Sequence, residues 1–360
     1  MATEQKQQPG RQGWLKRLFA TKEEPAVSPP PADGTKIPIP PPTAPAPSDA
    51  INEPAERMVA PPPSLVLAAI VKNEAPYLLE WIAYHRAVGV DHFIIMDNES
   101  TDGTFFLLRP LAEAGVLTYF RWNNEFKYKG FEEHNTGPQV PAYNFAFRVA
   151  NKLNHWDWIG FIDLDEFILP TESATIGDVL RGFSSSAAVG VNWRMFGSSG
   201  HKSAPKGLIT ENFTHCAIKS FSANQHVKSI ARVAKLRQAG IHIHNSADGD
   251  VVDMAGQRIS PARAGIHDAV VHDKLVINHY FTKSHEEWLR KRVKGNVSSR
   301  IIDPDWERPH EMFAAYDRNE IEETAILRFL PEIRRGIDEL NEMIRNFSGR
   351  ETSSASARDL

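Results

Sequence analysis

Two aspartates separated by one residue, Asp163 and Asp165, come directly after an apolar run that ends at Ile162. A carboxylate pair at this spacing can share one divalent cation. Hard oxygen ligands favour Mg²⁺ or Mn²⁺, which also bind the phosphates of substrates. The same short pattern can be a solvated acidic turn that caps the next helix. Apolar residues flank the pair on both sides, and this placement favours a functional pair.

A second polar segment, residues 97–104, follows another apolar run. In this segment Asp97 and Asn98 could accept or donate hydrogen bonds to a base or a ribose. Asp102 is a further candidate for binding the same ligand, although a helix N-cap is an equally good explanation for it. We therefore treat the three residues as candidate ligand contacts.

Two more polar clusters follow apolar runs in the same way. Lys72 and Glu74 come just after the first run, where they could contact a ligand, or could be a surface charge and a first-turn acid that favours the helix dipole. His279 follows a late strand-like run and could complete a metal shell or contact a diphosphate. Lys283 opens a dense basic stretch, for which phosphate is the natural counterpart.

The elements that must position these residues alternate along the chain. Continuous apolar runs indicate strands buried on both faces of a sheet, and three- and four-residue spacings indicate helices. Strands are expected at 65–71, 92–96, 116–119 and 156–162, with helices at 77–85 and 105–114 and further strand-like runs at 189–193 and 275–281. This order predicts a doubly wound mixed α/β sheet flanked by helices, in which ligands bind at the carboxyl ends of the strands.

The two ends of the chain differ from the middle. Fifteen of the 25 prolines fall within residues 1–63, which predicts a disordered Pro-rich arm. Its short basic amphipathic start could touch a membrane surface or a partner protein, or could be a solvated tail. We expect one main domain at 64–310, a C-terminal helical extension at 311–347 with one apolar face, and a disordered tail at 348–360.

Composition narrows the function further. A formal charge of −4 lacks the cationic excess that nucleic-acid binding needs, so no nucleic-acid partner is expected. Cys216 is the only cysteine and can form neither an intramolecular disulfide nor a thiolate metal site. No apolar run approaches the ~20 residues of a membrane span, and no secretory signal is expected. These observations predict a cytoplasmic protein, with a peripheral position at the inner membrane face as a second option.

Several motifs in order resemble bacterial family 2 type glycosyltransferases, and in particular the branch that shares features with glycosyltransferase family 92. The motifs lie at 68–74, 77–85, 89–93, 97–104, 158–167, 193–201 and 278–284. The resemblance implies a GT-A fold, a nucleotide-diphosphate sugar donor, and Mn²⁺ or Mg²⁺ held by Asp163, Asp165 and His279. It also implies that Asp97 contacts the base or ribose, that Asp163 contacts the ribose, and that the reaction inverts the anomeric carbon.

The catalytic base and the acceptor site are less clear in the sequence. Glu286 and Asp268 are our base candidates, with Glu211 and His201 as weaker alternatives. The Glu-Asp pair that many family 2 enzymes carry after the metal motif is missing in the corresponding region. Trp193 and His201 could line an acceptor site by stacking on a sugar ring, although large aromatics are often core residues.

The predicted function is transfer of a sugar from a nucleotide-sugar donor, UDP-linked rather than GDP-linked, to a hydroxyl of a glycan or lipid-linked saccharide. One alternative is a degenerate GT-A domain that binds a sugar nucleotide or glycan without turnover. A nucleotidyltransferase would also use a metal-bound carboxylate pair. It would usually place a Gly-rich basic loop after the first strand, and residues 72–74 are not such a loop.

Overall fold

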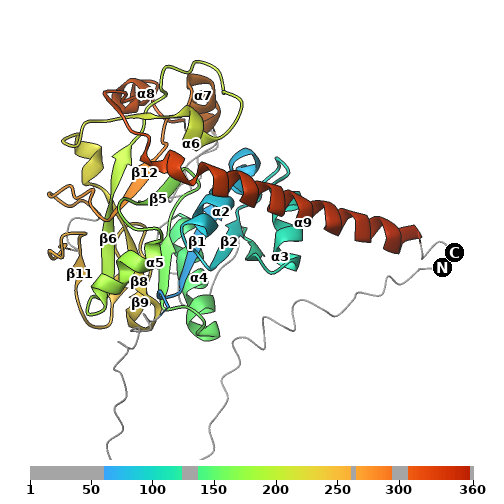
Figure 1. The fold of residues 1–360 in the computed structure, drawn as a ribbon, viewed down its shortest axis with the longest axis horizontal. Helices are drawn as coiled ribbons and strands as arrows, with labels where there is room; N and C mark the ends of the chain where they lie inside the picture. The colour runs from blue at the N-terminus through green and yellow to red at the C-terminus, as the bar shows by residue number, and fades with distance from the viewer. Residues whose placement is uncertain (1–60, 124–136, 261–264, 294–306, 357–360) are drawn as a thin grey trace, which may run out of the picture. The chain divides into compact units, whose positions relative to one another are not determined.

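The computed structural model describes residues 61–123, 137–260, 265–293 and 307–356 (Figure 1). The predicted Pro-rich arm therefore lies outside the described residues, apart from its last three. The sheet strands are β1 Leu65–Val71, β2 His92–Asp97, β3 Leu117–Arg121, β4 Trp158–Phe161, β5 Glu166–Pro170, β6 Ala188–Met195, β8 Val227–Arg232, β11 Val251–Val252 and β12 Leu275–His279. The helices are α2 Ala75–Ala87, α3 Thr104–Glu113, α4 Gln139–Leu153, α5 Ile176–Leu180, α6 Ile209–Asn212, α7 His285–Val293, α8 Glu311–Tyr316 and α9 Leu330–Ser356.

Short elements complete the described chain. Two small ladders pair β9 Leu236–Gln238 with β10 Asn245–Ser246, and β7 His215–Cys216 with β13 Ile321–Glu322. Single 3₁₀ turns lie at Arg181–Phe183, Ser222–Gln225, Val233–Lys235 and Ala325–Phe329.

The central sheet has the order β3-β2-β1-β4-β8-β6-β12-β5, with β11 paired to β6. Strands β3, β2, β1 and β4 are parallel, whereas β8 is antiparallel to both β4 and β6, and β5 is antiparallel to β12. The prediction of a mixed α/β sheet flanked by helices is confirmed. The carboxyl ends of β1, β2 and β4 lie at one edge of the sheet, where three of the predicted polar segments begin.

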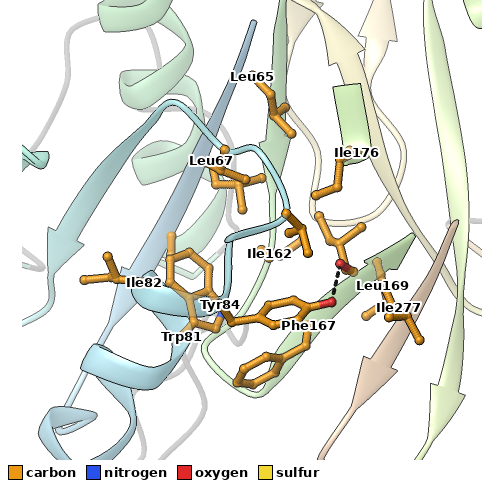
Figure 2. Close-up of a cluster of buried hydrophobic side chains, with 14 of the residues drawn as sticks. Leu65, Leu67, Trp81, Ile82, Tyr84, Ile162, Phe167, Leu169, Ile176 and Ile277 are labelled. Atoms are coloured by element: carbon orange, nitrogen blue, oxygen red, sulfur yellow. Dashed lines mark hydrogen bonds between the residues drawn. The ribbon is translucent and has the colours of Figure 1, made fainter. Parts of the chain in front are cut away.

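Helices cover both faces of the sheet. All seven side chains of β1 are buried, as the continuous apolar run predicted. On one face Leu65 and Leu67 pack with α2 (Figure 2). On the other face α4 contacts β1, and the Tyr143 ring lies 5.0 Å from that of Phe161. Burial on both faces explains why this strand has no polar alternation.

Helix α2 is bonded to the strand that follows the aspartate pair. Trp81 donates its Nε1–H to the carbonyl of Glu166 at 3.0 Å. The Tyr84 hydroxyl donates to the carbonyl of Ile168 at 2.9 Å, the bond dashed in Figure 2. The backbone N–H of Ile168 donates to His85 Nε2 at 3.3 Å. These buried bonds hold β5, and with it the turn at 163–166, against the helical layer.

The C-terminal helix packs on the main domain. Figure 1 shows α9 crossing α2 and α3, and the buried side chains of Ile333 and Leu340 belong to the main hydrophobic core. α9 runs to Ser356, beyond the boundary expected at 347. Once a long helix is nucleated, each further residue adds a hydrogen bond at little cost, which overrides the low helix preference of the Ser-rich end. Within the described residues no helix could cross a membrane.

Candidate functional site

Asp163 lies at the carboxyl end of β4, half-exposed, and three side chains hold its carboxylate. Gln139 Nε2 and the Tyr143 hydroxyl, both on α4, donate to Oδ1 at 3.0 and 3.2 Å. Lys228 on β8 donates to Oδ2 at 3.0 Å. The carboxylate is thus oriented by a helix on one face of the sheet and by the neighbouring strand.

Lys228 is a buried ammonium between two acids. Its side chain is 1% exposed and also lies 3.4 Å from Glu166 Oε2, which accepts the backbone N–H of Asp163 at 2.9 Å. Burial would lower the pKa of Lys228, but Asp163 and Glu166 hold it above its ordinary value. Burial raises the pKa of Glu166 to about 8 despite the lysine. Asp163 Oδ2 lies 3.0 Å from the Lys228 ammonium, closer than Glu166 Oε2, so Asp163 is the nearer counter-ion of Lys228.

Asp165 faces a different set of partners. Its Oδ2 accepts a hydrogen bond from Lys291 Nζ at 2.6 Å, and its Oδ1 lies 3.6 Å from His279 Nε2. Burial alone would raise the pKa of Asp165. Lys291, His279 and then Lys283 outweigh it and hold that pKa well below its usual range. Asp165 is therefore ionised over the whole physiological pH range.

His279 ends β12 beside this carboxylate. Burial lowers its pKa, which Asp165 partly counteracts, and its ring lies 4.4 Å from that of Trp193 in an edge-on contact. Trp193 stacks in turn on His226 at 4.8 Å. The structure therefore brings His279, predicted for the metal, next to Trp193, predicted for the acceptor.

A cleft of about 430 Å³ opens beside Asp165. It lies between the loops that follow β1 and β12 and helix α7. Its lining is Asn73, Glu74, Pro76, Tyr77, Asp102, Asp165, Thr282, Lys283, Glu287, Arg290, Lys291 and Val293. Three cations line it against four acids. Two of the acids, Glu287 and Asp102, are already bonded to the protein, through Ser284 and Ala75 respectively.

Two residues of this cleft have strained backbone. Asn73 and Lys283 have φ values of 52° and 49°, which residues other than glycine rarely adopt. The Lys283 ammonium lies 4.6 Å from the centre of the Tyr77 ring, and its side chain is buried. Such strain costs about 1–3 kcal/mol and clusters at ligand sites in general.

Whether a divalent cation could bind here depends on the side-chain oxygen and nitrogen atoms that could act as its ligands. No group of three or more His, Cys, Asp or Glu side chains in the described part of the chain is arranged to hold a metal. Asp165 and His279 offer one oxygen and one nitrogen 3.6 Å apart. Mg²⁺ and Mn²⁺ commonly take one or two protein ligands together with waters and substrate phosphates. The pair therefore fits such an ion, whereas both oxygens of Asp163 are already bonded to protein.

The residues predicted after β2 are held within the protein. Asp97 is buried and accepts from the Tyr119 hydroxyl and the Ser100 backbone N–H, both at 3.0 Å. Asn98 donates to the carbonyl of Trp122. Asp102 accepts from the backbone N–H groups of Ala75 and Thr104, so it caps the starts of α2 and α3 while it lines the cleft. Neither Asp97 nor Asn98 is among the residues that line the cleft.

Some of the remaining predicted residues line the cleft, and others do not. Glu74 and Lys283 line the cleft, while Lys72, half-buried after β1, is not among its lining residues. His201 contacts the carbonyl of Asn212 through Nε2 and lies outside that lining.

The base candidates are not among the residues that line the cleft. Glu286 pairs with Arg290 and accepts the backbone N–H of Ala204 on an exposed surface. Asp268 is exposed and, like Glu286, does not line the cleft. Glu211 pairs with Arg334 of α9. Glu287 and Ser284 form the reciprocal cap of α7 that their spacing predicts.

Sequence reasoning missed four side chains of this site. Gln139, Tyr143 and Lys228 hold Asp163, and Lys291 holds Asp165. Lys228 lies in an otherwise ordinary strand sequence, and no local pattern reveals that its side chain is buried. Lys291 was noticed only as part of a basic stretch, since α7 and β4 are far apart in the sequence.

A known protein family matches most of this chain. The model of glycosyltransferase family 92 matches residues 68–326, well over half of the chain. A glycosyltransferase family 92 protein of Oryza sativa subsp. japonica is 28% identical over 67% of this chain and 37% of its own length. One from Ricinus communis is 27% identical over 67% of this chain and 39% of its own length. An Arabidopsis thaliana protein named galactan beta-1,4-galactosyltransferase is 32% identical over 28% of this chain and 19% of its own length.

Solved structures show only a weak likeness. S. aureus TarS, residues 1–349 in complex with UDP, is 17% identical over 48% of this chain and 47% of its own, with a TM-score of 0.27. Glucosyl-3-phosphoglycerate synthase from Mycobacterium tuberculosis, solved with Mn²⁺, UDP and its product, is 14% identical over 56% and 75%, with a TM-score of 0.29. Scores this low carry no argument for this chain.

The chain spans about two fifths of the length of the first two of these plant relatives. The predicted link to a family 92 branch is confirmed. The bacterial family 2 type that was predicted with it is not supported, because the matching relatives named here are plant proteins. Because the family model matches residues 68–326, more than half of the sequence, the chain belongs to glycosyltransferase family 92.

Proposed function

We propose that this chain is a metal-dependent glycosyltransferase of GT-A type. It transfers a sugar from a UDP-sugar to a hydroxyl group of a glycan or lipid-linked saccharide. The observation that carries the proposal is the cleft with Lys283, Arg290 and Lys291 beside Asp165, at the ends of β1, β4 and β12 in a family 92 chain. Cations at this edge of an α/β sheet suit a diphosphate.

The donor occupies the cleft with its diphosphate toward Lys283 and Arg290. Tyr77 presents an aromatic ring in the same lining, to which Asn73 and Glu74 add polar groups. Because one relative is named as a galactosyltransferase, UDP-galactose is the first donor to test. Asp97, Asn98 and Asp102 act on the donor indirectly, by fixing the loop after β2 and the starts of both helices.

Asp165 and His279 would hold the divalent cation, Mn²⁺ or Mg²⁺. When bound, the cation neutralises charge that develops on the leaving diphosphate. Asp163 would contact the ribose from the end of β4, and this role is supported by the way Lys228, Gln139 and Tyr143 fix its carboxylate.

The reaction itself is a displacement. The acceptor hydroxyl oxygen forms a bond to the anomeric carbon as the bond from that carbon to the diphosphate oxygen breaks. The hydroxyl proton passes to a base, and UDP leaves with the electron pair of the broken bond. Because the hydroxyl attacks on the side opposite the diphosphate, the anomeric centre is inverted. Trp193 provides a stacking surface for the acceptor sugar next to His279.

A donor panel tests the proposal. The purified protein is incubated with UDP-, GDP-, CMP- and dTDP-sugars in Mn²⁺ or in EDTA, and nucleotide release is measured beside an Asp163→Asn/Asp165→Asn double variant. Metal-dependent release of UDP that the double variant loses is the expected result. Equal release by parent and variant, or no binding of any sugar nucleotide with metal present, contradicts the proposal.

One observation favours a second candidate, a domain that binds a sugar nucleotide without turnover. Neither Glu286 nor Asp268, the base candidates, lines the cleft. This candidate predicts metal-dependent UDP-sugar binding with no transfer to any acceptor in a glycan array. Transfer to a single array position excludes it.

We further propose a cytoplasmic location with peripheral attachment through residues 1–63. Basic and apolar residues alternate at helical spacing at the start of that arm. Co-sedimentation with anionic liposomes tests the attachment. Equal sedimentation of the full chain and of a chain that starts at residue 64 contradicts it.

A further inference from the structure

Asp165 already has a cation. The Lys291 ammonium lies 2.6 Å from Asp165 Oδ2 and 2.8 Å from the carbonyl oxygen of Phe281, and it sits 4.1 Å from the centre of the Phe281 ring. Its side chain is 20% exposed, and that of Asp165 is 14% exposed. Lys291 therefore makes a close and well-shielded ion pair with the carboxylate proposed to hold the metal.

A divalent cation on Asp165 and His279 would lie close to this ammonium. A hard cation such as Mg²⁺ binds a carboxylate oxygen at about 2.0–2.1 Å. The oxygen that Lys291 contacts and the oxygen beside His279 both belong to the Asp165 carboxylate, so the ion and the ammonium would be close neighbours. Like charges this close repel strongly where water is largely excluded. The ion and Lys291 cannot both keep their best positions on Asp165.

Of the two lysines on the aspartate pair, only Lys291 can leave. Lys228 is 1% exposed on a central strand and is held by both Asp163 and Glu166. Lys291 lines the 430 Å³ cleft on α7, near Lys283 and Arg290. Its flexible four-carbon stem can turn into the cleft. Once a divalent cation occupies Asp165, Lys291 loses its counter-ion, and a diphosphate bound beside Lys283 and Arg290 would supply a new one.

We propose that Lys291 and a divalent cation compete for Asp165, so that the cation binds tightly only when a diphosphate is present to receive the Lys291 ammonium. This inference rests on the donor site proposed above. It makes metal and UDP binding mutually reinforcing, because a coupling free energy between two ligands is reciprocal.

Direct titration of Mn²⁺ tests the competition without any need for turnover. Free Mn²⁺ is followed by electron paramagnetic resonance for the parent and for Lys291→Met, with and without saturating UDP. Without UDP we expect Lys291→Met to bind Mn²⁺ at least tenfold more tightly than the parent. Saturating UDP should increase the Mn²⁺ affinity of the parent at least tenfold. It should also reduce the difference in Mn²⁺ affinity between the parent and Lys291→Met.

Two controls locate the effect. Lys219→Met removes a positive charge from an exposed position outside the cleft lining and should change Mn²⁺ affinity less than twofold. Adding Asp165→Asn to Lys291→Met should abolish the gain in Mn²⁺ affinity. Circular dichroism melts check that each variant is folded.

Several results overturn the proposal. These are unchanged or weaker Mn²⁺ binding by Lys291→Met, a gain in Mn²⁺ affinity just as large in Lys219→Met, or a gain in Mn²⁺ affinity that survives Asp165→Asn. The outcome is independent of the proposed activity. A gain in Lys291→Met together with no sugar transfer by the parent leaves the competition standing and removes the glycosyltransferase proposal.

Discussion

His85 offers a quantitative test of how the turn at 163–166 is held in place. It is fully buried in α2, where Nδ1–H donates to the carbonyl of Trp81 at 2.9 Å and Nε2 accepts the backbone N–H of Ile168. Burial lowers its pKa from 6.5 to about 3, and the bond to Trp81 only partly opposes this. The imidazole is therefore neutral in the native protein.

The sign and size of the pH effect follow from linkage. Between pH 6.5 and 3 the unfolded chain binds a proton at this position and the native chain does not, so stability is lost as pH falls through that window. From pH 7.5 to 5.5 this amounts to about 1.3 kcal/mol for one histidine with these pKa values. His242, His244 and His272 act in the same direction, since burial lowers their pKa values too. Glu166, whose pKa is raised, acts in the opposite direction.

The contribution of His85 is isolated by comparison with His85→Gln, whose amide can donate and accept hydrogen bonds but does not titrate. Urea unfolding at pH 7.5, 6.5 and 5.5 gives the free energy of unfolding for both proteins. The parent should lose about 1.3 kcal/mol more than the variant over this range. His310→Gln, at an exposed position, is the matched control and should follow the parent. The same pH dependence in parent and His85→Gln would refute the buried neutral imidazole.

Three further predictions concern the site. Asp102→Ala should lower stability by about 1–2 kcal/mol in thermal unfolding, because it uncaps α2 and α3 together; unchanged stability with a much weaker donor affinity would instead make Asp102 a direct ligand. Glu286→Gln and Asp268→Asn should each keep donor turnover within twofold of the parent, since neither side chain lines the cleft; a loss of 100-fold or more in either variant would identify it as the base. His279→Gln should weaken Mn²⁺ binding in the presence of UDP at least tenfold in isothermal titration, and an unchanged affinity would remove His279 from the metal shell.

The strands that carry the site were predictable because their physical signal is local. β1 and β2 are continuous apolar runs, and the polar residues that follow them lie at the sheet edge where a parallel sheet must place them. The proximity of Asp165 and His279 was expected from family resemblance alone. The sequence spacing of 114 residues between them carries no such signal.

What the sequence could not reveal depends on tertiary contacts. The roles of Lys228 and Lys291 arise from antiparallel pairing of β8 with β4 and from the packing of α7 beside β12. The sequence leaves open whether Asp102 contacts a ligand or caps a helix. In the structure it caps α3, which follows it directly, and also α2, which begins 27 residues earlier. The disposition of Glu286 likewise follows from the exposed face of α7 on which it lies.

The central claim is that a uridine diphosphate binds in the cleft beside Asp165, and equilibrium titration of UDP in the presence of Mn²⁺ tests it most directly. Lys283→Met removes a buried cation from the cleft lining. We predict that this variant binds UDP at least tenfold more weakly than the parent, which corresponds to about 1.4 kcal/mol. Lys219→Met, at an exposed position outside that lining, should bind like the parent. Equal UDP affinity in the parent and Lys283→Met would contradict the account.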